Sequence, residues 1–252
     1  MKKGLIVVLL FALCLTGNAL AGEGHGGGVH WSYSGETGPA HWGELSPDFK
    51  MCAEGKNQSP IDLTGMVTGK LPNLKYDYGK SPLMLVNNGH TIRVNYAEGG
   101  DIWIGDERYH FLQFHFHSPS ENQIEGESFP LEAHLVHAND QGELAVISVM
   151  FRIGPANPLL DKLWRYTPSM APSTMSVSTG SIRVADLLPS SRDYYAFDGS
   201  LTTPPCSEGV RWLVLKQPVT ASAEQIEKFR SFFGDHDTNR PLQPLNGRVI
   251  YQ

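Results

Sequence analysis

Short stretches in which apolar and polar residues alternate predict several β-strands along the chain. The alternating segments are residues 92–96, 109–117 and 131–137. Residues 144–151 and 209–215 are nearly continuous apolar runs, which are typical of strands buried on both faces. A turn at Asn88-Gly89 precedes the first of these strands. The pattern therefore predicts a mainly β fold.

Two segments with helical spacing predict short helices at the edge of that fold. The first follows Asn157, has Pro158 at its first position and ends before Pro168. Its apolar positions are Leu159, Leu160, Leu163 and Trp164. The second begins at Ser222, and Gln225 three residues later forms a capping-box pattern. Its predicted buried positions are Ile226, Phe229 and Phe233, and its predicted stop is Gly234.

The N-terminus has the layout of a secretory signal peptide. Lys2 and Lys3 precede an apolar run over residues 5–15, and Ala19-Leu20-Ala21 is typical of a cleavage site. We therefore predict a signal peptide over residues 1–21 and export to the periplasm or the medium. We predict that residues 22–29 form a flexible Gly-rich arm and that residues 30–252 form one domain. No later stretch is long and apolar enough to predict a membrane span.

Composition narrows the function classes. Of the 252 residues 40% are hydrophobic, which is enough for a sizeable core. A formal charge of −6 argues against a nucleic-acid-binding protein. After cleavage two cysteines remain, Cys52 and Cys206, and in an oxidising compartment a disulfide is their simplest state. Two buried free thiols remain an alternative, whereas a metal role is disfavoured because neither has a C-x-x-C partner.

The candidate chemistry lies on two of the predicted strands. Side chains alternate between faces, so Gln113, His115 and His117 share one face, while Leu112, Phe114 and Phe116 point into a core. The second strand places Glu132, His134 and Val136 on one face.

If these two strands pair, three histidines come together in the arrangement of a catalytic zinc site with an open fourth position. Gln113 and Glu132 would then each accept a ring N–H, from His115 and His134, and so fix the tautomer. Structural histidines remain the alternative, because an H-x-H in a strand is common without metal.

Seven segments together resemble the α-class carbonic anhydrases, in particular a secreted bacterial member. They are residues 41–43 (HWG), 57–62 (NQSPID), 87–90 (NNGH), 113–117 (QFHFH), 132–137 (EAHLVH), 200–206 (SLTTPPC) and 240–246 (RPLQPLN). They occur in the family's order and span the mature domain.

The resemblance implies a central ten-stranded, mostly antiparallel sheet and one Zn²⁺ per chain. The implied ligands are His115 and His117 through Nε2 and His134 through Nδ1. The implied reaction is the reversible hydration of CO2 to bicarbonate and a proton, by attack of zinc-bound hydroxide. Thr202 matches the residue that orients this hydroxide, and Glu121, 13 residues before His134, matches the acceptor of the Thr202 proton. His90 matches the proton shuttle.

The same resemblance implies further residues and properties. The substrate pocket is expected to include Val136, Val146, Leu201, Thr202, Thr203, Val210 and Trp212. The water network towards the shuttle is expected to include Tyr33, Asn88 and Thr203. A Cys52–Cys206 disulfide, inhibition by sulfonamides and anions, side esterase activity and a homodimer are also implied.

Three departures from the family pattern bear on turnover and inhibition rather than on the reaction. Ser118-Pro119 replace a Trp-Gly pair, Asn122 stands where a histidine is common, and Arg93 occupies a cavity position often held by a smaller polar residue. Two other functions have less support in the sequence. A binding module that has lost zinc would lack one of the three histidines, and a zinc reservoir on the arm would need more than His25 and His30.

Overall fold

A computed structural model describes residues 29–97 and 99–252 of the chain. Its helical elements are η1 (Gly35–Thr37), α1 (Trp42–Leu45), η2 (Pro47–Phe49), α2 (Met51–Glu54), α3 (Pro158–Tyr166), η3 (Val184–Leu187) and α4 (Ala223–Ser231). Its strands are β1 (Asp62–Leu63), β2 (Leu74–Tyr78), β3 (Ser81–Asn87), β4 (Ile92–Asn95), β5 (Gly100–Ile104), β6 (Glu107–His117), β7 (Gln123–Ile124), β8 (Leu131–Ala138), β9 (Leu144–Ile153), β10 (Ser173–Ile182), β11 (Tyr194–Ser200), β12 (Glu208–Leu215) and β13 (Val219–Ala221). The predicted signal peptide and all of the Gly-rich arm except Val29 lie outside the described residues.

One large sheet organises the described chain. Its main path runs β10-β3-β4-β6-β8-β9-β12-β11, while β5 joins β2 to β6 and β13 pairs with β9. The pairings are antiparallel except those of β9 with β12 and with β13. The mainly β, mostly antiparallel prediction is therefore confirmed. The described residues give an 11-stranded sheet where the resemblance implied ten strands, and β13 is only three residues long.

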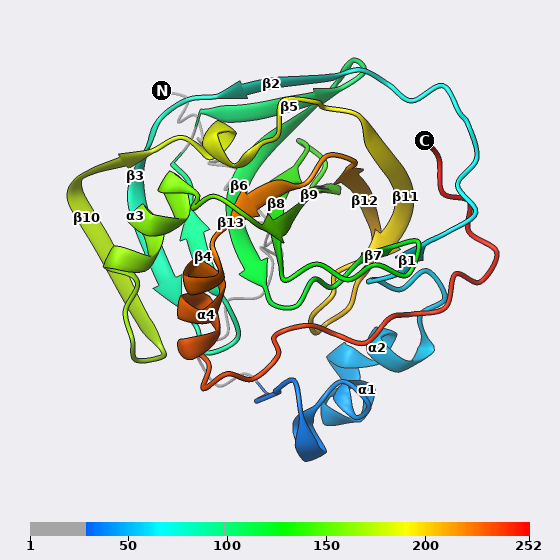
Figure 1. Cartoon of the computed structure of the whole chain (residues 1–252). Helices are drawn as coiled ribbons and strands as arrows, with labels where there is room; N and C mark the ends of the chain where they lie inside the picture. The colour runs from blue at the N-terminus through cyan, green and yellow to red at the C-terminus, as the bar shows by residue number, and fades with distance from the viewer. Residues whose placement is uncertain (1–28, 98) are drawn as a thin grey trace, which may run out of the picture.

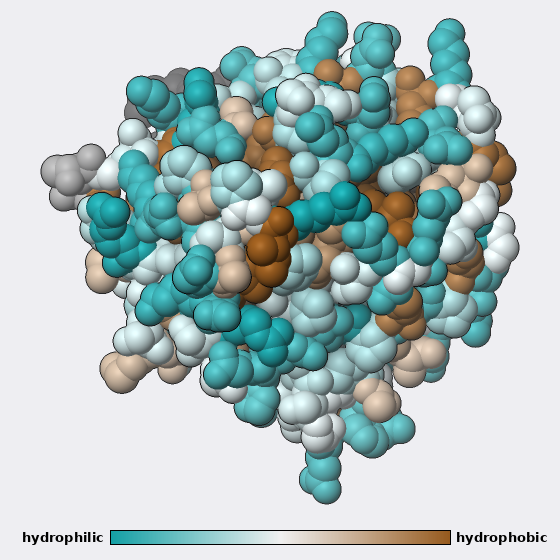
Figure 2. Space-filling view, viewed as in Figure 1, coloured by the Kyte–Doolittle hydropathy of each residue, from teal (hydrophilic) through white to brown (hydrophobic). Residues whose placement is uncertain are grey.

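The sheet is strongly curved, and its helices lie on its flanks (Figure 1). The helices α3 and α4 lie beside β3, β4 and β10, whereas the short α1 and α2 lie at the opposite, lower side of that view. In the space-filling view this face is mostly hydrophilic, with a few hydrophobic residues between polar ones (Figure 2). None of the described helices has the length and apolar character that a membrane span requires.

The two faces of the sheet bury different apolar clusters. The larger cluster fills the space between the sheet and the helices α3 and α4, and it includes Phe114, Phe116, Trp164 and Phe229. The smaller cluster lies on the other face and includes Val136, Val146, Val210 and Trp212. Because β8 and β9 contribute to both clusters, they are buried along almost their whole length, as the continuous apolar run of residues 144–151 predicts.

The prediction for Leu112 is wrong. The β6–β8 register pairs Phe111 with His137 and then Gln113 with Val136, so Leu112 is an extra residue in a β-bulge. Phe111 therefore joins the larger cluster, and Leu112 packs against the smaller cluster on the other face. Beyond the bulge the alternation is regular, so the prediction that Phe114 and Phe116 point away from His115 and His117 is confirmed.

Both predicted helices are present with their predicted caps. The Asn157 side chain accepts from the backbone N–H groups of Leu159 and Leu160, and Ser222 and Gln225 form the capping box. The helix α4 ends at Ser231, earlier than predicted, and a further turn follows. Gly234 (φ +63°) closes that turn while the Asp235 N–H donates to the Arg230 carbonyl at 3.1 Å.

Cys52 and Cys206 form a disulfide with a Cα–Cα distance of 5.0 Å, so the free-thiol alternative is excluded. The bond lies in a third buried cluster with Trp42. It closes a loop over a sequence separation of 154. In the chain-entropy description such a loop contributes about 5 kcal/mol to the free energy of unfolding.

Candidate metal centre

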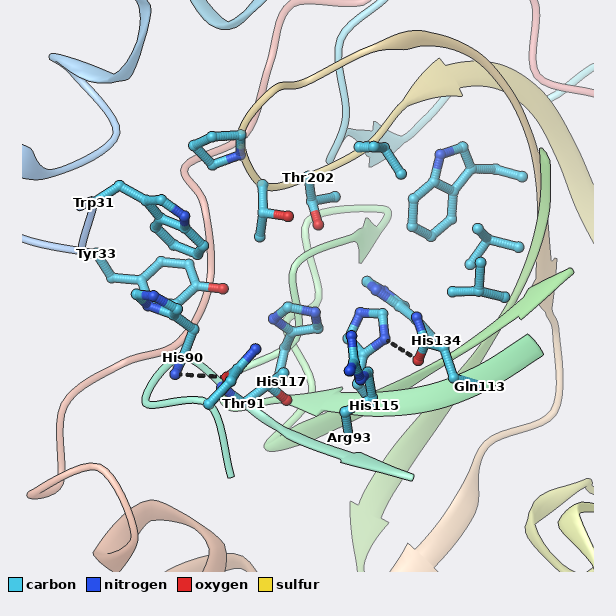
Figure 3. Close-up of a pocket in the computed structure, with 17 residues that line it drawn as sticks. Trp31, Tyr33, His90, Thr91, Arg93, Gln113, His115, His117, His134 and Thr202 are labelled. Carbon is cyan, nitrogen blue, oxygen red and sulfur yellow. Dashed lines mark hydrogen bonds between the residues drawn. The ribbon is translucent and has the colours of Figure 1, made fainter. Parts of the chain in front are cut away.

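Three imidazoles meet where β6 and β8 pair. The register places His115 directly opposite His134, and His117 lies two residues further along the same face of β6. One ring nitrogen from each histidine lies within 4.8 Å of those of the other two. The predicted pairing of the two strands is confirmed, and with it the prediction that His134 joins His115 and His117 (Figure 3).

Each imidazole has an oxygen neighbour beside one of its two ring nitrogens. Gln113 Oε1 lies 2.9 Å from His115 Nδ1, and Glu132 Oε1 lies 2.9 Å from His134 Nε2. Both residues lie where the sequence predicts them. The third neighbour is the Thr238 carbonyl, which accepts from His117 Nδ1 at 2.6 Å. Sequence reasoning missed it, because a main-chain carbonyl has no side-chain signature.

The arrangement fits a bound metal ion. With Nδ1 of His117 donating to Thr238, its Nε2 carries the lone pair, and this buried nitrogen has no hydrogen-bond partner among the described residues. A buried acceptor without a partner is costly unless a ligand completes it. The pKa of His115 is held well below its usual value by burial and by repulsion from His117 and His134. Neutral imidazoles are the form that binds metal.

Glu121 is buried directly behind the histidines. Its Oε2 lies 3.4 Å from His117 Nε2 and 3.8 Å from His134 Nδ1. Burial raises its pKa to about 7, while His134, Thr202 and the backbone N–H of Arg240 partly offset that rise. The Arg240 N–H donates to Glu121 Oε1 at 2.9 Å. Thr202 is thus among the groups that lower the pKa of Glu121, and its pairing with Glu121 stays a prediction.

The histidines open into a cavity of about 150 Å³ with one apolar and one polar side. The apolar side is lined by Val136, Val146, Leu201 and Trp212, and Thr202, Thr203 and Pro204 lie next to it. Val210, which the resemblance assigns to the pocket, is buried in the same apolar cluster but is not among the residues that line this cavity. The polar side includes Tyr33, Asn88, Thr91 and Gln113.

His90 stands on the polar side, stacked on Trp31. Their ring centroids are 3.8 Å apart at an interplanar angle of 11°, and Tyr33 lies edge-on to His90 at 6.4 Å (Figure 3). Asn88 Oδ1 accepts from the backbone N–H groups of His90 and Thr91, so this residue also shapes the turn that carries His90. Sequence reasoning missed Trp31, because the stacking partner of a turn histidine leaves no pattern in the sequence.

Two of the departures from the family pattern lie at this centre. Arg93 lines the cavity from β4, directly opposite His115 in the β4–β6 pairing. Asn122 is buried, and its Nδ2 donates to Glu132 Oε1 at 2.9 Å while its Oδ1 accepts from the Ile61 N–H at 3.2 Å. Asn122 therefore supports the carboxylate beside His134.

Comparisons with known proteins agree with this geometry. A carbonic anhydrase of Pectobacterium carotovorum is 47% identical over 250 residues, covering 99% of each chain. One of Neisseria gonorrhoeae is 44% identical over 251 residues, covering 97% of this chain and 96% of its own. The α-carbonic anhydrase of Thermovibrio ammonificans, solved with the inhibitor sulfanilamide, has a TM-score of 0.87 at 48% identity and covers 90% of this chain and 100% of its own. The family model described as eukaryotic-type carbonic anhydrase matches residues 37–252, and the chain belongs to that family, the α-class carbonic anhydrases.

Proposed function

We propose that this chain is an exported zinc lyase that hydrates CO2 reversibly to bicarbonate and a proton. The observation that carries the proposal is the group of three imidazoles, each with an oxygen neighbour beside one ring nitrogen, in a cavity with one apolar side. His115 and His117 would hold Zn²⁺ through Nε2 and His134 through Nδ1. A Zn²⁺ ion with three histidine ligands acidifies a bound water and so supplies the nucleophile, chemistry for which carbonic anhydrase is itself the standard example.

Thr202 and Glu121 orient the attack. The Glu121 carboxylate accepts the Thr202 hydroxyl proton, so the hydroxyl oxygen is left to accept a hydrogen bond from the nucleophile and fix its direction. The pair is buried, and its interactions are therefore little screened by water. Val136, Val146, Leu201 and Trp212 provide an apolar surface for CO2, which has no charge to bind. Thr203 would contact the substrate from the adjoining wall.

His90 moves the proton to solvent. Histidine has an ordinary pKa near neutrality, so it exchanges a proton in either direction. Its ring lies on the polar side of the cavity, and Tyr33, Asn88 and Thr203 would order water between it and the metal centre. The stack on Trp31 holds the ring at one position in this structure.

The remaining predictions follow from the same site and fold. Sulfonamides and anions would inhibit by occupying the open position, and activated esters would be hydrolysed as a side reaction. The Thermovibrio ammonificans enzyme was solved in complex with one sulfonamide inhibitor, sulfanilamide. The Cys52–Cys206 disulfide supports an oxidising, exported location. A homodimer stays a prediction.

Stopped-flow CO2 hydration by the mature protein at about pH 8 tests the proposal, before and after zinc is stripped and restored. We expect hydration that disappears with zinc and returns with it. In weak buffer His90→Ala should lower turnover on the order of 100-fold, and turnover should recover when imidazole is added. A folded protein that binds one zinc and hydrates no CO2 would overturn the proposal.

A further inference from the structure

Ser148 is the one polar residue in the apolar run of residues 144–151. It is completely buried on β9, a position where a hydroxyl is costly unless it is hydrogen-bonded. Ser148 pairs directly with His134 in the β8–β9 register. Its hydroxyl donates to Glu132 Oε1 at 2.6 Å. The buried hydroxyl is thus directed at the carboxylate that accompanies His134.

The Glu132 carboxylate has more donors around it than it has positions to accept them. Oε2 accepts from the backbone N–H groups of Glu121 at 2.6 Å and Asn122 at 3.0 Å. Oε1 accepts from Ser148 at 2.6 Å and from Asn122 Nδ2 at 2.9 Å. A carboxylate offers about two lone-pair positions on each oxygen, so these four donors use all of them.

The His134 ring N–H is a fifth potential donor beside this carboxylate. Its Nε2 lies 2.9 Å from Oε1, a hydrogen-bonding distance, yet its ring N–H is not aligned to form a hydrogen bond with any described residue. The lone pair that it would use is directed to the Ser148 hydroxyl or to the Asn122 amide. Ser148 and His134 therefore compete for the same oxygen.

We propose that Ser148 is a positioning residue that limits the hydrogen bond between Glu132 and His134 and so tunes how strongly His134 binds metal. A carboxylate that accepts a ring N–H makes the imidazole a more basic ligand. By occupying Oε1, the Ser148 hydroxyl holds His134 back from that state. Zinc binding would then be weaker, and the bound ion would be a stronger Lewis acid. This inference rests on the proposed function, since it assumes that His134 is a zinc ligand.

The test compares Ser148→Ala with wild type and with Val149→Ala. Val149 is the next residue of β9 and is buried in the larger cluster on the opposite face, so its truncation weakens the strand without touching Glu132. Zinc affinity is measured by chelator competition on zinc-stripped protein. The strength of the His134 hydrogen bond is measured from the proton resonance of its ring N–H in the zinc-loaded protein.

We expect Ser148→Ala to bind zinc about three- to tenfold more tightly, a fraction of the 10- to 100-fold effect of losing such a carboxylate partner. The His134 ring proton should move downfield. Val149→Ala should leave both unchanged although it lowers stability. A structural role alone would weaken zinc binding, so tighter binding separates the two explanations.

Unchanged or weaker zinc binding by folded Ser148→Ala, with the His134 proton unmoved, would overturn the inference and leave the proposed function standing. A wild-type protein that binds no zinc would instead overturn the proposed function. If Ser148→Ala does not fold, Ser148→Gly removes the same hydroxyl, and the same two measurements decide.

Discussion

Two histidines three residues apart on β8 face opposite sides of the sheet and have opposite surroundings. His134 and His137 are both buried, with 1% and 0% of their surface exposed. His134 lies beside Glu132, with His115 and His117 across the metal centre. His137 lies in the larger apolar cluster, where its Nδ1 is 3.3 Å from the Ala145 carbonyl and its Nε2 is 2.7 Å from the Tyr78 hydroxyl.

The contrast indicates that hydrogen-bond partners, rather than burial, distinguish a candidate metal-binding histidine from a structural one. Nδ1 of His137 donates to the Ala145 carbonyl, so Nε2 accepts from the Tyr78 hydroxyl. Both ring nitrogens of His137 therefore have hydrogen-bond partners. Burial lowers its pKa to about 3, which keeps it neutral. On the other face the imidazoles each present one nitrogen to a shared point. A buried histidine whose two nitrogens both have protein partners is therefore a poor metal candidate.

The largest effect that separates the two faces should come from removing the site histidine. His134→Ala is expected to lose zinc binding and to lower kcat/KM for CO2 hydration by a factor on the order of 10³ or more, because two imidazoles do not hold a catalytic zinc. Metal content and stopped-flow hydration measure this. His137→Gln is the matched control on the same strand and should retain zinc and activity. Equal losses in both variants would contradict the distinction between the faces.

The second effect is a pH dependence that belongs to His137. Unfolded histidine has a pKa near 6.5, whereas burial holds the folded pKa of His137 at about 3. Between these values the unfolded chain binds a proton that the folded chain does not. Stability therefore falls as the pH falls from about 6.5 towards 3, by up to about 4–5 kcal/mol from this one group.

Urea unfolding of zinc-free wild type and His137→Gln between pH 4 and pH 8 isolates this group. Every other titrating group is shared and cancels in the difference. The variant is expected to be less stable at pH 8 and to lose less stability on acidification, so the two curves converge. Parallel curves would show that His137 does not contribute to the acid sensitivity.

A smaller effect should follow from removing the hydrogen bond between the Tyr78 hydroxyl and His137 Nε2. Tyr78→Phe removes the hydroxyl that donates to Nε2 and leaves a buried acceptor without a partner, which costs about 1–3 kcal/mol in the free energy of unfolding. Hydration activity should stay within about twofold of wild type, since the change lies on the core face of β8. Urea unfolding and stopped-flow hydration on the same samples measure both. A loss of activity larger than the loss of stability explains would place Tyr78 in the site.

Sequence patterns predicted most of the centre because period-two alternation is a property of any regular strand. It placed His115 and His117 on one face and Gln113 and Glu132 beside their histidines. It failed at Leu112, because the bulge there depends on the partner strand and leaves no mark in the alternation. Thr238 acts through its main-chain carbonyl, 121 residues from His117, so no side-chain pattern points to it.

The smallest effect concerns another histidine, His110 on β6, whose side chain is 41% exposed. Hydrogen bonds that its ring donates to the carboxylates of Asp140 and Asp101 raise the pKa of His110 above the usual value. This contribution to stability is present below about pH 6.5 and is lost as the pH rises through the raised pKa. Asp140 is 82% exposed and water screens the pair, so Asp140→Asn should change the free energy of unfolding by at most about 0.5 kcal/mol at pH 6 and by nothing measurable at pH 8.5.

Urea unfolding at both pH values, at low and at high salt, measures the change, which salt should abolish. A salt-independent loss above about 1 kcal/mol would mean that Asp140 contributes through more than this pair. If the expected result is obtained, the different roles of His110, His134 and His137 follow from their different surroundings. The exposed carboxylate of Asp140 does little for His110, two neutral partners in the core make His137 structural, and a nitrogen directed to a point shared with His115 and His117 makes His134 the proposed metal ligand.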